Sequence, residues 1–558
     1  MTSVDQQKAL NARLEFKQQL DAIPKMKPIK LILLVGWSLA MSALDNTIVN
    51  IANPQIQIDS HFVPHGSQIP QSTLQWINDI YSVAFASFAI PASKIGDRFG
   101  VTIVHRWGVC GFVICSVFCG ISRFISYEIT PWEYGGFYVL IFVRFFQGIF
   151  AAFLMANSMT LCGILVSQQD IPKSMAMNSL AFAAATALGP PLGGILTDYA
   201  GWEWCFFINL FIGIISVALC WKYLPVTPKF LEAKLDWFGG VIVLVGLMIM
   251  IFGFTYIPPE KGAIPVGIIS TLAGFGIIAA FVFWETVHPY AILPKQLLFN
   301  KKIMYSLFAG FFNFALIVTV SFQLPFALQS IHGYSPTVVG LVSLVNPIFQ
   351  VLSAFVGNWL AKKVTSYIVK LVSSIIIASF VIMLGFIIQY SIVYIVINNC
   401  FFSFFLGVFF VSNNQFMMQI ATPDIRGMIG GCIQAFRETG YAVGIAFVNL
   451  IHDLAMSHNW GTKPIPNRDD DNFQDYSKAY YSAFCTTDIA MSFVAILAMG
   501  FGILSGTNQH ESKLWGYPKR LLVNEQQEQQ PLIEEGNAQE QPVEENSKKN
   551  SFSETSDA

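Results

Sequence analysis

The sequence predicts an all-α integral membrane protein that crosses the bilayer fourteen times. Hydrophobic residues make up 54% of the 558-residue chain and charged residues 12%, whereas soluble domains carry about 25% charged residues. The apolar residues gather in long runs, each close to the roughly 20 residues that a helix needs to span a bilayer. Lys and Arg concentrate in alternate loops, as in helical membrane proteins of defined orientation.

The fourteen runs define the expected organisation of the chain. The spans are 31–52, 74–96, 103–125, 136–164, 174–197, 203–224, 237–257, 264–284, 306–329, 337–361, 367–390, 392–420, 428–452 and 483–506. We expect a cytoplasmic segment (1–30), an N-terminal six-helix bundle (31–224), two additional helices (225–300), a C-terminal six-helix bundle (301–506) and a disordered cytoplasmic tail rich in Gln and Glu (507–558).

The positive-inside pattern places both termini in the cytoplasm. Of the 32 Lys and Arg residues, the outer loops receive only Arg123, Lys261, Lys463, Arg468 and Lys478. The polar loops 59–72 and 459–478 are expected outside, and the polar first 29 residues show no cleavable signal peptide. The membrane is expected to be a bacterial cytoplasmic membrane or a plasma membrane. An endolysosomal or vacuolar membrane is the alternative, because Glu528–Ile533 resembles an acidic dileucine sorting signal.

Several function classes are disfavoured. A net charge of -2 gives no electrostatic footprint for nucleic acid. The nine Cys residues form no CxxC pair, so neither a disulfide framework nor a metal site is indicated. No P-loop is present to bind ATP. We therefore expect no cofactor, no metal and no enzymatic reaction.

Asp45 is the first candidate site residue, since it lies inside the apolar run 31–52. A charge near the bilayer centre costs at least about 2.5–3.5 kcal/mol, so such residues mark functional sites by default. The alternative is an acid at an aqueous mouth that only orients the helix. Asn50 falls on another face, together with Asn46 and Asn53, and this face is expected to pack against a helix or to line a pore.

Other charged residues in or near the spans are candidates too. Arg144 lies in the fourth span, followed by Gln147 and Gly148, and its guanidinium needs an acid such as Asp45. Asp79, near the start of the second span, is interpreted as an interfacial carboxylate. The alternative places it in an outer vestibule that receives cationic substrates.

The adjacent Arg437 and Glu438 lie in the thirteenth span and need not pair, since neighbours on a helix point about 100° apart. Glu438 is a second candidate proton or cation site, and a structural ion pair with another helix is the competing interpretation.

Two Gly-bearing motifs complete the candidate set. Asp97, Arg98 and Gly100 form a short connection between the second and third spans, where the charges can lock neighbouring helix ends. The fifth span carries closely spaced small and bending residues, Gly189, Pro190, Gly193 and Gly194. Proline bends a helix and glycines admit a neighbouring backbone.

Together these motifs resemble those of the fourteen-span drug:proton antiporters of the major facilitator superfamily. LDNTIVNIANP, from Leu44, resembles LDxTIVNVALP, and Val143–Gly148 matches R-x-x-Q-G. Ser93–Gly100 resembles G-x-x-x-D-R-x-G with Ser for the first Gly, and Ala185–Gly194 resembles G-x-x-x-G-P-x-x-G-G with Ala for the first Gly. The segment from Arg426 to Gly444 resembles the pattern of the thirteenth span.

The resemblance implies the major facilitator fold and export of small amphipathic or cationic compounds, such as drugs or toxic metabolites, by proton antiport with alternating access. Protonation of Asp45 would favour one state, and Arg144 would tune its proton binding. A dedicated exporter of one metabolite or siderophore is an alternative, and a non-transporting sensor or scaffold is another. The expected partners are the small-molecule substrate, protons and the lipid bilayer, with accessory export proteins if the chain is bacterial.

Overall fold

The computed structural model describes residues 22–506 apart from 65–66, 127, 129–133, 230–235, 259–262, 289–292, 294, 421–422, 462–465 and 467–469, together with residues 15, 18 and 19. The predicted tail 507–558 lies outside the described residues, as does most of the predicted N-terminal segment 1–30.

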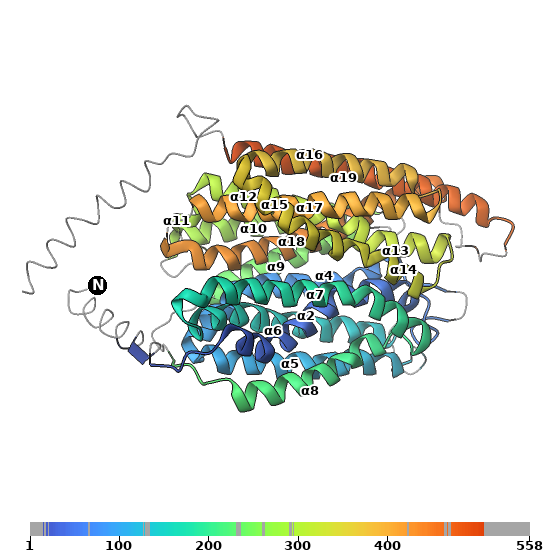
Figure 1. The fold of residues 1–558 in the computed structure, drawn as a ribbon. Coiled ribbons are helices and arrows are strands. Elements are labelled where there is room, and N and C mark those ends of the chain that lie inside the picture. Colours follow the sequence, from blue (N-terminus) through green and yellow to red (C-terminus); the bar gives the residue numbers. More distant parts are fainter. Residues whose placement is uncertain are drawn as a thin grey trace, which may run out of the picture. The chain divides into compact units, whose positions relative to one another are not determined.

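Helices form the whole of the regular structure within these ranges (Figure 1). The long helices are α2 (Pro28–Gln57), α4 (Trp76–Phe99), α5 (Val101–Ile121), α6 (Gly136–Ile164), α7 (Ile171–Tyr199), α8 (Trp204–Tyr223), α9 (Trp237–Tyr256), α10 (Ile264–Val287), α12 (Lys301–Val318), α15 (Val345–Lys363), α16 (Ser366–Ile387), α17 (Ile392–Ile420), α18 (Pro423–Asn459) and α19 (Phe473–Leu504). The shorter elements are α3 (Gln71–Leu74), η1 (Ser122–Phe124), η2 (Gln168–Asp170), α11 (Lys295–Leu298), η4 (Thr319–Gln323), α13 (Leu324–Phe326), η5 (Ala327–Ile331) and α14 (Pro336–Ser343).

Twelve helical segments of the described residues are long and apolar enough to cross a membrane. They coincide with twelve of the fourteen predicted spans. The other two predicted spans coincide with α4 and α7, which are 24 and 29 residues long but do not belong to this set. Asp79, Lys94 and Asp97 make α4 less apolar than its neighbours.

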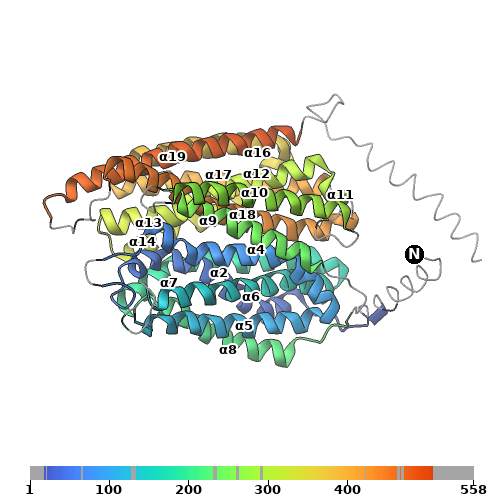
Figure 2. The same cartoon turned by 180° about the vertical axis from the view of Figure 1, so that it is seen from behind.

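Most helices pack on other helices from the same part of the chain. In the first part, α2 packs on α7 and α8, α6 packs on α4 and α5, and α5 packs on α8. In the last part, α17 packs on α15 and α16, whereas α12, α18 and α19 pack on one another. Helices α9 and α10 form a pair, and α9 also contacts α4 and α18 (Figure 2).

Local sequence explains where several helices begin. Pro28 occupies the first turn of α2, where its missing N–H costs nothing. Side-chain oxygens of Asp236, Asn300, Ser335 and Thr365 accept backbone N–H groups at the starts of α9, α12, α14 and α16.

The predicted boundaries at 389–392 and 459–478 can be compared with the observed helix ends. The prediction that two spans join at 389–392 with almost no loop is confirmed, since α16 ends at Ile387 and α17 begins at Ile392. The predicted outer loop 459–478 is too long, because α19 already begins at Phe473.

Lys370 lies near the start of α16. Its side chain is fully buried within α16, and Nζ donates to the hydroxyls of Ser306 at 3.1 Å and Ser505 at 2.7 Å. Phe416 presents its ring 3.9 Å from Nζ. The hydroxyls and the ring replace water around this cation, so a lysine can be accommodated between helices.

The chain is π-helical over Thr319–Gln323 and again over Ala327–Ile331. Pro325 lies between these segments and has no backbone N–H, so the α-helical hydrogen bond to the carbonyl of Ser321 cannot form. Wider turns of this kind often occur at functional sites.

Helices α7 and α14 approach each other backbone to backbone. A Cβ added to Gly194 would overlap the carbonyl oxygen of Pro336, and one added to Gly340 would overlap that of Pro190. The Thr337 N–H donates to Asp198 Oδ2 at 2.8 Å beside this contact. The glycines are therefore required by the closeness of the two helices.

Gly340→Ala should lower the thermal unfolding midpoint in detergent by several degrees, because overpacking a tight contact costs about 1–3 kcal/mol. Gly276→Ala in α10 is the matched control, since a Cβ there meets nothing within 4 Å. The control should be neutral or stabilising, because Ala is the better helix former by about 0.5–1 kcal/mol. An equal rise in both variants would contradict the packing role of Gly340.

Candidate functional site

A fully buried ion pair lies among the N-terminal helices. Arg144 Nη1 on α6 is 2.5 Å from Asp45 Oδ2 on α2, and neither side chain is exposed at all. Breaking a buried pair by removing one partner costs about 3–5 kcal/mol. The two charges therefore fix α2 and α6 relative to each other.

Two amide side chains donate to the Asp45 carboxylate, and one hydroxyl joins these amides to each other. Gln147 Nε2 and Asn209 Nδ2 each donate to Asp45 Oδ1 at 3.0 Å. Both amides also reach the hydroxyl of Ser116, at 3.3 and 2.8 Å. Helices α2, α5, α6 and α8 thus converge on one carboxylate.

The Arg144 guanidinium also contacts a backbone carbonyl, an amide oxygen and an aromatic ring. Nε donates to the carbonyl oxygen of Ile77 at 3.2 Å, and Nη1 donates to Gln147 Oε1 at 2.9 Å. The Tyr81 ring lies 4.3 Å from Cζ, as a cation–π contact. Nη2 has no hydrogen-bond partner in the described part of the chain.

Sequence reasoning singled out Asp45, Arg144 and Gln147 but missed Asn209 and Ser116. Asn209 closes the run from Gly201 to Asn209 that follows the fifth span, so its place in a motif was the available signal. Ser116 stands in an ordinary apolar run, and no feature of that run distinguishes it from a packing residue.

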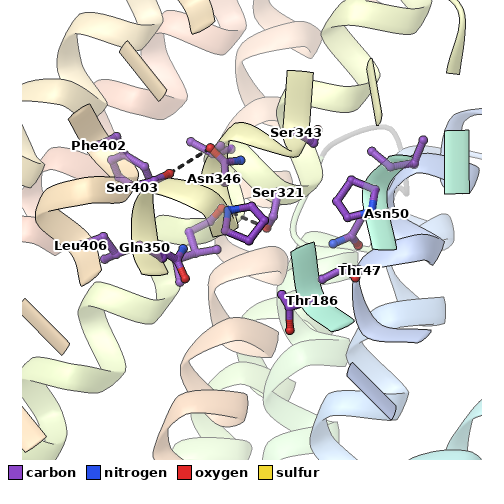
Figure 3. Close-up of a pocket in the computed structure, with 15 residues that line it drawn as sticks. Thr47, Asn50, Thr186, Ser321, Ser343, Asn346, Gln350, Phe402, Ser403 and Leu406 are labelled. Carbon is purple, nitrogen blue, oxygen red and sulfur yellow. Dashed lines mark hydrogen bonds between the residues drawn. The ribbon is translucent and has the colours of Figure 1, made fainter. Parts of the chain in front are cut away.

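A cavity of about 110 Å³ lies next to this cluster, between N-terminal and C-terminal helices (Figure 3). Its polar lining is Thr47 and Asn50 of α2, Thr186 of α7, Ser321 of η4, Ser343 of α14, Asn346 and Gln350 of α15, and Ser403 of α17. The apolar lining includes Pro190, Ile317, Phe402 and Leu406. Pockets that bind drug-sized ligands have volumes of about 300–1,000 Å³, so the helices must separate before such a compound can enter.

Asn50 links the cavity to the C-terminal helices. Its Nδ2 donates to the hydroxyl of Tyr441 at 2.9 Å, and Ser321 Oγ is 3.4 Å from the same hydroxyl. Asn50 Oδ1 is buried and has no donor among the described residues. Of the two roles expected for the Asn face, the position of Asn50 fits cavity lining.

Asp79 lies in the first turn of α4, and its place at the membrane interface remains a prediction. Its side chain is fully buried in α4, and neither carboxylate oxygen has a hydrogen-bond partner among the described residues. The apolar surroundings of α4 shield it from water, which position in the sequence alone did not reveal. A buried carboxylate without donors is costly when ionised.

Arg437 and Glu438 form an ion pair with each other, although adjacent helix positions need not pair. Arg437 Nη2 is 3.2 Å from Glu438 Oε1, because long side chains can bend past the angle between adjacent helix positions. The Arg437 guanidinium also lies 5.4 Å from the Phe182 ring of α7 and 5.2 Å from the Phe314 ring of α12. It therefore contacts helices from both halves of the chain.

The connection from α4 to α5 turns at Gly100, whose φ of +97° favours glycine. Thr102 N–H donates to Thr227 Oγ1 at 3.1 Å, so this connection packs on the chain after α8. Asp97 and Arg98 form no ion pair with another described residue, and their role in locking helix ends remains a prediction.

The predicted small residues lie where helices touch. A Cβ on Gly148 would overlap the carbonyl oxygen of Tyr81, and one on Gly189 would overlap Thr47 Oγ1. A Cβ on Gly193 would come within 2.9 Å of the Ile48 carbonyl oxygen. These positions hold α6 on α4 and α7 on α2.

A larger cavity, of about 960 Å³, lies where α2 ends and α19 begins. Its lining includes Asp453, Asp470 and the buried His452, whose ring centroid is 4.9 Å from that of Tyr480. No group of three His, Cys, Asp or Glu side chains that could hold a metal ion occurs in the described ranges.

Comparison with known proteins connects this arrangement to a family. The model of the Major Facilitator Superfamily matches residues 35–445. The chain belongs to the major facilitator superfamily. Among curated relatives, the riboflavin transporter RibZ of Clostridioides difficile is 26% identical over 450 residues, covering 78% of this chain and 90% of its own. The methylenomycin A resistance protein of Bacillus subtilis is 25% identical, covering 77% and 89%.

Solved structures support the same fold. The POT family transporter PepTSo aligns with a TM-score of 0.58 at 14% identity, covering 87% of this chain and 98% of its own. A bacterial homolog of the human lysosomal transporter Spinster aligns with a TM-score of 0.56 at 15% identity, covering 85% and 96%. This superfamily protein is therefore an all-helical transporter with the major facilitator fold.

Arg144→Met should destabilise the protein by about 3–5 kcal/mol, because it leaves the Asp45 carboxylate buried and unpaired. The double variant Asp45→Asn/Arg144→Met should recover much of that loss in chemical unfolding, since no isolated charge remains. Lys301→Met, at an exposed position, is the control for loss of a cation. Additive effects of the two substitutions would show that the pair is not energetically coupled.

Proposed function

We propose that this protein exports small amphipathic or cationic compounds by proton antiport with alternating access. The observation that carries the proposal is the position of α2, which holds Asp45 in the buried ion pair and presents Thr47 and Asn50 to the cavity. A change in the charge of the Asp45 carboxylate can therefore alter the cavity by moving α2.

The proposed coupling depends on the charge of Asp45. Protonation removes the negative charge that Arg144 faces, and the shell of Gln147 and Asn209 must then rearrange. A ligand shifts the balance between two states only by binding them with different affinity. Proton and substrate would thus favour opposite states of α2.

Relatives of this chain support an export role. Besides the methylenomycin A resistance protein, they include the multidrug transporter protein MdtP of Bacillus subtilis, which is 26% identical over 338 residues and covers 60% of this chain. We propose that α4 and α7 cross the membrane as well, giving fourteen spans in two six-helix bundles with α9 and α10 between them. Helix α4 packs extensively on α6, and α7 packs extensively on α2, which supports this count.

We further propose that both termini lie in the cytoplasm, as the distribution of Lys and Arg indicates. A bacterial cytoplasmic or plasma membrane fits this topology, and an endolysosomal or vacuolar membrane is the alternative. The substrate, protons and lipid are the proposed partners, with accessory export proteins in a bacterial host.

A second candidate is a dedicated exporter of one metabolite. The relative named as a riboflavin transporter favours it, since that protein covers most of this chain. A broad resistance profile on expression in a drug-sensitive host would distinguish multidrug export from this alternative.

Asp45→Asn should abolish accumulation driven by a pH gradient in inside-out vesicles, because the coupling proton loses its site. Exchange of labelled for unlabelled substrate should continue, which also shows that the variant folds. A panel that includes tetraphenylphosphonium and chloramphenicol serves for the assay. Asp475→Asn is the matched control, with its side chain 73% exposed. An Asp45→Asn variant that still concentrates substrate would refute the proposed role of this acid.

A further inference from the structure

We propose that the central cavity selects uncharged compounds that combine hydrogen-bonding groups with an apolar body, and that it discriminates against cations. The proposal rests on the proposed function, because it names the substrate class of that same cavity. It narrows the proposed range of amphipathic or cationic compounds to the uncharged ones.

The composition of the cavity wall is the first observation. Hydroxyl and amide side chains supply all of its polar groups, and none of the described residues that line it is ionisable (Figure 3). A cation leaving water for this space would meet dipoles but no opposite charge in the wall itself. Burial of an unpaired charge is far more costly than burial of a neutral polar group.

The second observation is an unused acceptor within this wall. Asn50 is 4% exposed, and its Oδ1 has no donor among the described residues although its Nδ2 is occupied by Tyr441. Buried polar groups are normally paired. A hydroxyl or amide N–H of a ligand would supply the missing donor.

The opposite wall offers a second polar contact. Asn346 Oδ1 accepts from Ser403 Oγ at 2.9 Å, which leaves the Asn346 amide N–H groups to donate to a ligand oxygen. Phe402 and Leu406 lie beside this pair and present apolar surface. A ligand that spans the cavity would therefore meet an acceptor on α2 and donors on α15.

A positive charge near one end of the cavity also disfavours cationic ligands. Phe182 and Phe314, whose rings lie 5.4 and 5.2 Å from the Arg437 guanidinium, stand about one turn from the lining residues Thr186 and Ile317. The acid closest to that cation is Glu438, already 3.2 Å from it. A cationic ligand gains no free carboxylate there.

Export of an uncharged compound in exchange for protons would add the membrane potential to the forces that drive transport. If an uncharged molecule leaves the cell in exchange for one or more protons, each cycle moves net positive charge across the membrane. Export is then driven by the membrane potential as well as by the pH gradient. A monovalent cation exchanged for one proton would move no net charge.

Binding of two probes to the purified protein tests the selectivity. Chloramphenicol is uncharged and carries hydroxyl and amide groups, and tetraphenylphosphonium is a permanent cation. We expect chloramphenicol to bind more tightly, and Asn346→Asp to reverse the order by favouring tetraphenylphosphonium about tenfold, as buried charge pairs do. Gln389→Glu adds a charge at an exposed position between α16 and α17 and should change neither affinity.

Tighter binding of tetraphenylphosphonium to the unsubstituted protein, or no binding of chloramphenicol, would overturn the proposal. So would an unchanged preference in a folded Asn346→Asp variant. Because binding needs no proton gradient, these results are independent of antiport. Chloramphenicol that binds but is not concentrated by a pH gradient would refute the proposed function and leave the ligand class intact.

The electrical consequence is tested in inside-out vesicles without a pH gradient. A lumen-positive potential set with potassium and valinomycin should drive accumulation of chloramphenicol, and its collapse should stop it. Accumulation that responds to the pH gradient but not to the potential would overturn the inferred charge movement.

Discussion

The ion pair between Asp45 and Arg144 is the constraint on which the N-terminal helices depend. Two charges without access to water are stable only in contact, and their separation here is 2.5 Å. That contact requires α2 and α6 to keep one register. Asn209 of α8 donates to the Asp45 carboxylate, and the hydroxyl of Ser116 on α5 accepts from the Asn209 amide. The glycines at 148 and 189 permit the close approach of the helices around the pair.

The ion pair and the cavity lie against neighbouring faces of α2. The carboxylate faces α6 and α8, away from the cavity lining, while Thr47 and Asn50 face the C-terminal helices. A proton on the acid and a ligand in the cavity need not compete for the same atoms. Coupling between them would act through the position of the helix, which the two-state description of transport requires.

Much of this arrangement could be predicted from the sequence. Twelve spanning helices follow from apolar run length, and Asp45 and Arg144 were recognisable because charge inside such a run needs a partner. The burial of Asp79 and Lys370 was not predictable, because hydropathy along one helix does not reveal which neighbouring helices exclude water. Asn209, Ser116 and the cavity lining of α15 and α17 depend on contacts between distant segments, where Ser and Asn look like ordinary packing residues.

The hydrogen bond from the Thr337 N–H to the Asp198 carboxylate joins α7 to the N-terminus of α14. Thr337 lies in the first turn of α14, whose N–H groups lack helical partners and carry partial positive charge. A carboxylate from another helix satisfies one of them. If the two helices part, water can replace each partner, so the net loss is only about 1.5–3 kcal/mol. A contact of that size holds one conformation together yet breaks often enough to suit the alternating access proposed for this protein.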